Sequence, residues 1–155
     1  MTHAPEKLNT PATLLLGIGN SARRDDGLGW AFLDVIREQG QFAGEITYRY
    51  QLQVEDADVI RAYQTVIFVD ALHQPLEAGF YWKPCLPVAT FGFSTHALNP
   101  ESVVALCQEL YGEAPEAYTL GISGYDWELA EGLSRAAIIN LRAALLFFEE
   151  KAMKY

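Results

Sequence analysis

The chain has 155 residues, of which half are hydrophobic and 12% are aromatic, and its formal net charge is −9. A chain of this length and composition can bury a sizeable core as one domain, which argues against a disordered protein. The acidic balance argues against nucleic acid as the main partner, because binding to phosphates requires a basic face.

Targeting and membrane signals are missing from the sequence. Residues 1–12, MTHAPEKLNTPA, are polar and lack the apolar segment of a signal peptide. We expect a single domain over residues 1–155, with residues 1–12 as a flexible leader. The apolar stretch at 143–148 is far shorter than a membrane span. Cys85 and Cys107 lack C-x-x-C spacing, so we expect two reduced thiols in a cytoplasmic protein.

Residues 14–29, LLLGIGNSARRDDGLG, contain the most informative pattern. An apolar run predicts a buried strand, the glycines permit a turn, and a polar loop ends in the paired carboxylates Asp25 and Asp26. A helix should follow, because apolar side chains then recur at helical spacing: Leu28, Phe32, Val35 and Ile36. In an open α/β sheet, ligands bind in the crevice beyond the carboxyl ends of the strands, which is where both carboxylates would lie.

Three interpretations of this loop compete. A dinucleotide fingerprint is weakly supported, because position 22 is alanine where the third glycine of G-x-G-x-x-G would stand. Either Asp25 or Asp26 could cap the following helix. The other carboxylate would then be a metal ligand or a catalytic group, which requires partners elsewhere in the chain.

The middle of the chain predicts two strands joined by a short helix. Residues 46–52 alternate between apolar and polar side chains, which indicates a strand with one wet face. A short helix is expected over residues 54–63. Residues 66–69, VIFV, indicate a buried central strand that ends on Asp70. If this strand lies parallel to the first, Asp70 reaches the same rim as Asp26, although Asp also serves often as a turn residue.

The second half of the chain predicts an edge strand, two helices and a further strand. The edge strand is expected over residues 79–83 and the further strand over residues 118–122. Asn99 should cap a helix that starts at Pro100 and ends before Gly112. Ser134 can cap the last helix, whose expected buried stripe consists of Ala137, Ile138, Leu141, Leu145 and Phe148.

Three side chains on separate loops could form one site: Asp26, Asp70 and His96. Two carboxylates and an imidazole suit Ni²⁺, Zn²⁺, Mn²⁺ or Fe²⁺. A lone histidine before a helix is more often a structural residue than a ligand, and His73 is a rival to His96. The sequence contains neither the H-E-x-x-H helix of zinc proteases nor the G-x-S-x-G nucleophile elbow.

The chain resembles the hydrogenase maturation proteases, which cut the C-terminal extension from the large-subunit precursor of nickel–iron hydrogenases. The resemblance rests on GIGNSARRDDGLG at residues 17–29, FVDA at 68–71 and THALNPE at 95–101. Weaker support comes from QLQVED at 51–56 and GISGYDWELAEGLS at 121–134. It implies a three-layer α/β/α sandwich of the phosphorylase/hydrolase-like kind, with a mixed, mostly parallel, twisted five-stranded sheet.

The resemblance also implies the roles of single residues. It makes Asp26, Asp70 and His96 the metal contacts, Asp26 and Asp70 the catalytic pair of an aspartic-type endopeptidase, and Asp25 the helix cap. When empty, the three contacts should lie on the order of 4–6 Å apart, about twice a metal–ligand distance. Arg24 departs from the family, which often has glycine at that position.

By the same resemblance, nickel is supplied by the substrate precursor and is not held by the resting enzyme, so that the cut reports on metal loading. No separate cofactor-binding residues are expected, and neither nucleic acid nor a membrane is expected as a partner. A rival hypothesis is a non-catalytic nickel chaperone that binds the same precursor without cutting it. A nucleotide-binding domain is disfavoured by the broken glycine fingerprint.

Overall fold

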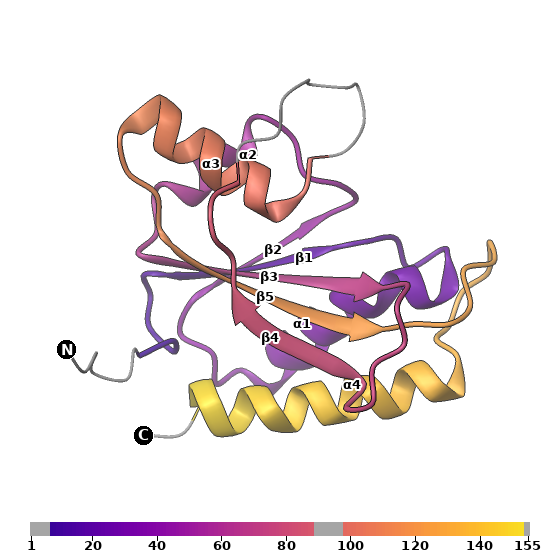
Figure 1. The fold of residues 1–155 in the computed structure, drawn as a ribbon. Coiled ribbons are helices and arrows are strands. Elements are labelled where there is room, and N and C mark those ends of the chain that lie inside the picture. Colours follow the sequence, from indigo (N-terminus) through magenta and orange to yellow (C-terminus); the bar gives the residue numbers. More distant parts are fainter. Residues whose placement is uncertain (1–6, 89–97, 154–155) are drawn as a thin grey trace.

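The computed structural model describes residues 7–88 and 98–153. Its centre is a five-stranded sheet with the strand order β2-β1-β3-β5-β4 (Figure 1). Neighbouring strands are parallel, except that β4 is antiparallel to β5. The strands are β1 (Thr13–Ile18), β2 (Glu45–Arg49), β3 (Thr65–Leu72), β4 (Phe80–Pro84) and β5 (Glu116–Ser123). The expected mixed, mostly parallel sheet is therefore confirmed.

Helices cover both faces of this sheet, so the predicted three-layer α/β/α architecture is confirmed. Helices α1 (Leu28–Gln39) and α4 (Arg135–Phe148) lie on one face, and α2 (Asp56–Ile60) and α3 (Pro100–Tyr111) lie on the other (Figure 1). Each face has its own apolar core cluster. Short helices adjoin α1 and α4, namely the 3₁₀ helix η1 (Arg24–Gly27) and the π-helix η2 (Glu149–Met153). Across 7–88 and 98–153, every helix is too short or too polar to span a bilayer.

Local sequence rules correctly placed two helix starts. The Asn99 side chain accepts a hydrogen bond from the Ser102 amide at 2.8 Å, and Pro100 occupies the first turn of α3. The Ser134 hydroxyl accepts one from the Ala137 amide at 3.2 Å at the start of α4. Both caps satisfy an amide that the helix itself leaves without a partner.

Other expectations require correction. The strand expected over 46–52 stops at Arg49, and the next side chain, Tyr50, is 68% exposed. The helix expected over 54–63 is reduced to the five residues of α2. Ile138 is 37% exposed, because the buried stripe of α4 runs through Ala137, Leu141, Ala144 and Phe148 and passes beside it. The flexible leader expected over residues 1–12 stays a prediction; of its described residues, Leu8 packs into the core cluster under α1 and α4.

Strand β3 continues past Asp70 to Leu72, so the expected end of this strand was two residues short. Its pairing with β1 ends at Val69, whereas its pairing with β5 continues through Leu72. Asp70 is therefore the first residue of β3 that no longer pairs with β1. Gly29 permits this arrangement, because an added Cβ there would lie 2.6 Å from the Val69 carbonyl oxygen.

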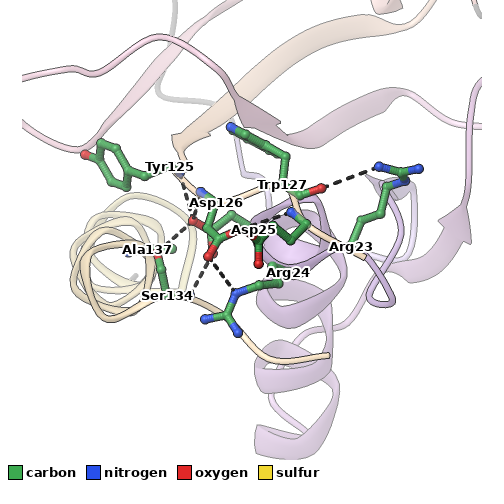
Figure 2. Close-up of polar contacts among 9 residues, drawn as sticks. Arg23, Arg24, Asp25, Tyr125, Asp126, Trp127, Ser134 and Ala137 are labelled. Atoms are coloured by element: carbon green, nitrogen blue, oxygen red, sulfur yellow. Dashed lines mark hydrogen bonds and ion pairs between the residues drawn. The ribbon is translucent and has the colours of Figure 1, made fainter. Parts of the chain in front are cut away.

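Asp25 does not cap α1, contrary to expectation. The cap position of α1 is Gly27, and no side chain bonds to the first turn there. The Asp25 carboxylate is fully buried and points to the segment before α4 (Figure 2). It accepts hydrogen bonds from the backbone amides of Tyr125, Asp126 and Ser134 and from the Ser134 hydroxyl, at 2.7–2.9 Å. Burial raises the pKa of Asp25, but these bonds outweigh it and hold the pKa below its ordinary value.

Replacing Asp25 by alanine should cost about 2–4 kcal/mol of unfolding free energy, more than the loss of an ordinary cap, because four buried donors lose their acceptor. A lowered folded-state pKa stabilises the fold above the unfolded pKa of about 4, and this contribution is lost as the pH falls through the folded value. Urea unfolding between pH 7 and pH 3 should therefore show a steeper acid loss in wild type than in Asp25→Ala. The matched control is Glu38→Ala, on the exposed side of α1; equal losses for both variants at pH 7 would contradict this role of Asp25.

Candidate functional site

The site lies where the sheet reverses its winding. From β1 the chain passes through α1 to β2 on one side, and then through α2 to β3 on the other side of β1. Helices α1 and α2 cover opposite faces, so the carboxyl ends of β1 and β3 form the switch point of the sheet, the place where ligands bind in open α/β sheets. Three segments meet there: residues 19–27 after β1, residues 70–79 from the end of β3, and residues 124–134 after β5.

The backbone of the first segment is held on both sides of Asp26. The Asn20 amide donates to the Asp26 carbonyl at 3.1 Å, and the Asp26 amide donates to the Arg23 carbonyl at 3.0 Å. Gly19 has a φ of 150°, and a Cβ there would collide with the Asp26 carbonyl oxygen. Close packing of the loop on itself thus accounts for the second glycine of the G-x-G pattern without a nucleotide.

The Asp26 side chain is half-buried. Burial raises its pKa above the ordinary aspartate value. The positive charges of His73 and Arg23 and the Asn20 amide act in the opposite direction and favour the ionised carboxylate. The side chain therefore lies in an environment where its protonation state depends on neighbouring charges.

The Asp70 carboxylate is the more strongly perturbed of the two. Burial raises its pKa to about 7, the hydrogen bond from the Ala71 amide at 2.8 Å opposes this shift, and the charge of Asp26 adds to it. The charge of Asp26 thus acts on Asp70, although the two residues come from different strand ends. Burial is the larger cause, and a carboxyl group with a pKa of about 7 can take or give a proton near neutral pH. This arrangement can serve as a general acid–base pair.

The third member of the expected trio, His96, lies outside the described residues. Asp26 and Asp70 are placed, but the convergence of all three side chains stays a prediction. Within residues 7–88 and 98–153, no group of three or more His, Cys, Asp or Glu side chains could hold a metal ion. The carboxylate pair by itself is an incomplete ligand set.

His73, the rival to His96, has a different contact. Its ring stacks on the Trp127 indole, with 3.6 Å between ring centroids and 14° between the ring planes. Its charge acts on Asp26, but it forms no metal-holding group with Asp26 and Asp70 in the described structure. Stacking holds the His73 imidazole flat against the Trp127 indole in the loop after β5.

Sequence reasoning missed the contribution of residues 124–134. This segment supplies the donors to Asp25 and the ring under His73, and its Trp127 carbonyl accepts a hydrogen bond from Arg23 at 3.4 Å. The only signal was the weaker resemblance over GISGYDWELAEGLS. Two surface hollows of about 360 and 270 Å³ lie at the opposite end of the sheet, lined in part by residues 61–64 and 84–87, and neither includes Asp26 or Asp70.

No protein-family model and no curated protein matches the sequence. Solved structures do match. A [NiFe] hydrogenase maturation protease HycI from Thermococcus kodakarensis KOD1 is 22% identical, with a TM-score of 0.69 over 93% of this chain and 94% of that chain. The hydrogenase maturating endopeptidase HybD from E. coli is 17% identical, with a TM-score of 0.67 over 89% and 90% of the two chains. A hydrogenase 3 maturation protease is 16% identical, with a TM-score of 0.66 over 91% and 89%.

These matches cover about nine-tenths of the chain at low sequence identity. The chain has the fold of solved hydrogenase maturation proteases.

Proposed function

We propose that this protein is an endopeptidase that removes the C-terminal extension of a nickel–iron hydrogenase large-subunit precursor after nickel has been inserted. The observation that carries the proposal is the interacting pair of Asp26 and Asp70 at the switch point of the sheet. The shared fold supports it, because solved structures with this fold are named as hydrogenase maturation proteases. The free thiols of Cys85 and Cys107 are consistent with action in the cytoplasm.

The carboxylate pair supplies the acid–base chemistry. Ionised Asp70 takes a proton from the attacking water as a general base, and its pKa of about 7 suits that task at neutral pH. Asp26 interacts with Asp70 and, beside His73 and Arg23, retains more of its charge. The pair then acts as an aspartic-type centre, in which the proton held by Asp70 is returned to the leaving amine.

Nickel belongs to the substrate in this proposal. The precursor holds the ion through cysteine thiolates, and Asp26, Asp70 and His96 complete its ligand set from the enzyme side. Oxygen and nitrogen donors without a thiolate form a weak nickel site, and both cysteines of this chain are buried in the core cluster under α3. Docking on the substrate's nickel would bring the scissile bond to the carboxylates, which gains rate by positioning.

A nickel chaperone that binds the same precursor without cutting it is the competing hypothesis. Its site residues could be the same, but it would need no acid–base pair. The raised pKa of Asp70 favours the peptidase, because a group poised to exchange a proton near pH 7 is suited to catalysis.

Asp26→Asn and Asp70→Asn should each keep the fold and lower the cleavage rate at least about 100-fold, since each removes an acid–base group. The assay incubates purified protein with nickel-loaded precursor and follows precursor mass. Glu38→Gln is the matched control, because that carboxylate is exposed on α1. Full cleavage by both variants would contradict the peptidase assignment, and wild type that binds the precursor without changing its mass would favour the chaperone.

As the pH rises from 5 to 8, the contribution of Asp70 to stability should fall while the cleavage rate rises. Because the pKa of Asp70 is raised to about 7 in the fold, its contribution to stability is present below the unfolded pKa of about 4 and is lost as the pH rises to 7. Asp70→Asn should therefore gain roughly 1–3 kcal/mol relative to wild type between pH 5 and pH 8, measured by urea unfolding. Cleavage by wild type should rise over the same range. A difference in unfolding free energy between Asp70→Asn and wild type that stays constant at all pH values would contradict the shifted pKa.

Nickel-free precursor should remain uncut, and the purified enzyme should contain less than one metal ion per chain. His96→Ala should weaken cleavage of the nickel-loaded precursor by about 10-fold or more without lowering the melting temperature, because one ligand to the shared ion is lost. Metal analysis of the enzyme and a comparison of nickel-free with nickel-loaded precursor test this. Equal cleavage of both precursors would refute recognition of nickel, and tightly held stoichiometric metal would indicate an ordinary metallopeptidase.

A further inference from the structure

Arg24 has the one positive φ angle found for a non-glycine residue in the described part of the chain, at 42°. This left-handed conformation is unfavourable for any side chain with a Cβ and favours glycine. Conformations of this kind persist where surrounding contacts impose them, and they concentrate at functional sites. Arginine at this position therefore needs compensating contacts, and the residue lies two positions before Asp26.

Those contacts come from residues 124–134. The Arg24 amide donates to the Ala130 carbonyl at 2.8 Å, and the Arg24 Nε lies 3.0 Å from the Asp126 carboxylate. Both side chains of this ion pair are about one-third exposed. The Asp25 amide also donates to the Asp126 carbonyl, at 2.9 Å. Figure 2 shows Arg24 reaching Asp126 beside the buried Asp25 carboxylate. We call the bonds that join residues 23–25 to residues 124–134 the clasp.

The clasp connects to both catalytic candidates. On one side, the Asp26 amide is bonded to the Arg23 carbonyl, so a shift of the Arg24 peptide is transmitted to Asp26 through the backbone. On the other side, Trp127 stacks on His73, which follows Asp70 in the chain by three residues. The same segment therefore contacts the chain before Asp26 and the chain after Asp70.

The four bonds to Asp25 would suffice to attach the two segments to each other. These four bonds do not explain why arginine occupies position 24. Glycine would adopt a φ of 42° without strain, and it could also adopt other backbone conformations. An arginine pinned by Asp126 and Ala130 holds one conformation. Arginine at this position therefore has an unfavourable backbone conformation, and its contacts fix the geometry of the chain next to the site.

We propose that Arg24 and Asp126 are positioning residues, which fix Asp26 relative to Asp70 through the clasp; this inference rests on the proposed peptidase function. Neither side chain needs to touch the substrate. A purely structural role would make the pair affect stability, whereas a positioning role makes it affect turnover in a protein that remains folded.

The decisive variant is Arg24→Gly, because glycine accepts the left-handed conformation while the ion pair is lost. Its melting temperature should stay within about 4 °C of wild type. Its kcat on nickel-loaded precursor should fall about 10- to 100-fold with KM nearly unchanged, as expected for a misplaced catalytic group. Arg24→Lys retains the charge and should recover part of the loss. The control Arg37→Ala removes an exposed ion pair with Asp34 from the last turn of α1 and should leave kcat unchanged.

Asp126→Ala should reproduce the loss, and it also removes the acceptor of the Glu128 amide at 3.1 Å. The double variant Arg24→Gly/Asp126→Ala should fall no further than Asp126→Ala alone, because the contact between Arg24 and Asp126 is already broken in that variant. Additive losses would overturn the pairing. Wild-type kcat in Arg24→Gly, or a kcat loss that merely follows a lowered melting temperature, would overturn positioning.

Amide hydrogen exchange provides a measurement that does not depend on cleavage. In Arg24→Gly, the amides of Asn20 and Asp26 should exchange faster while those of the sheet remain protected. If wild type fails to cut the precursor, the proposed function is wrong, and amide hydrogen exchange in Arg24→Gly is then the only test of the clasp. Unchanged exchange at both amides would overturn the clasp whether or not the enzyme is active.

Discussion

One buried carboxylate, that of Asp25, organises the functional end of this molecule. It brings the loop after β1 and the segment before α4 together through four short hydrogen bonds. A fully buried charge is tolerated only when its oxygens are satisfied, and each of these bonds is charge-assisted. The backbone of the neighbouring Asp26 is fixed by the Asn20 and Arg23 bonds, and its half-buried side chain lies beside the Asn20 amide.

The sheet contributes the second carboxylate through its register. Strand β3 is longer than the part of it that pairs with β1, so Asp70 emerges beside the end of β1 while β5 still supports it. Pairing with β5 holds the backbone of Asp70 in place, and its pairing with β1 has ended one residue before. Burial between these elements is what raises the pKa of Asp70 to about 7.

Much of the fold could be predicted from the sequence, because it depends on local rules. Asn99 and Ser134 were predicted as helix caps and are helix caps in the structure. The apolar run at residues 66–69 was predicted as a central strand and lies in β3. The errors arose where residues far away in the sequence determine the end of a strand or the role of a side chain. Pairing with β5 sets the end of β3 beyond Asp70, and the acceptor role of Asp25 depends on amides 100 or more positions away. The site could be predicted only as separate residues; the contacts of residues 124–134 with Arg24 and His73 had no local signature.

The sequence separation of the Asp25 bonds has a consequence for biosynthesis. The Ser134 amide and hydroxyl lie 109 positions from the carboxylate that they contact. Contacts of such range form late, because a long loop must close before they contribute any energy. A growing chain that has not yet reached Ser134 would hold an uncompensated charge where the clasp should be. These bonds can therefore form only after synthesis has reached the start of α4, and until then a nascent chain lacks the contacts that fix the loop next to Asp26.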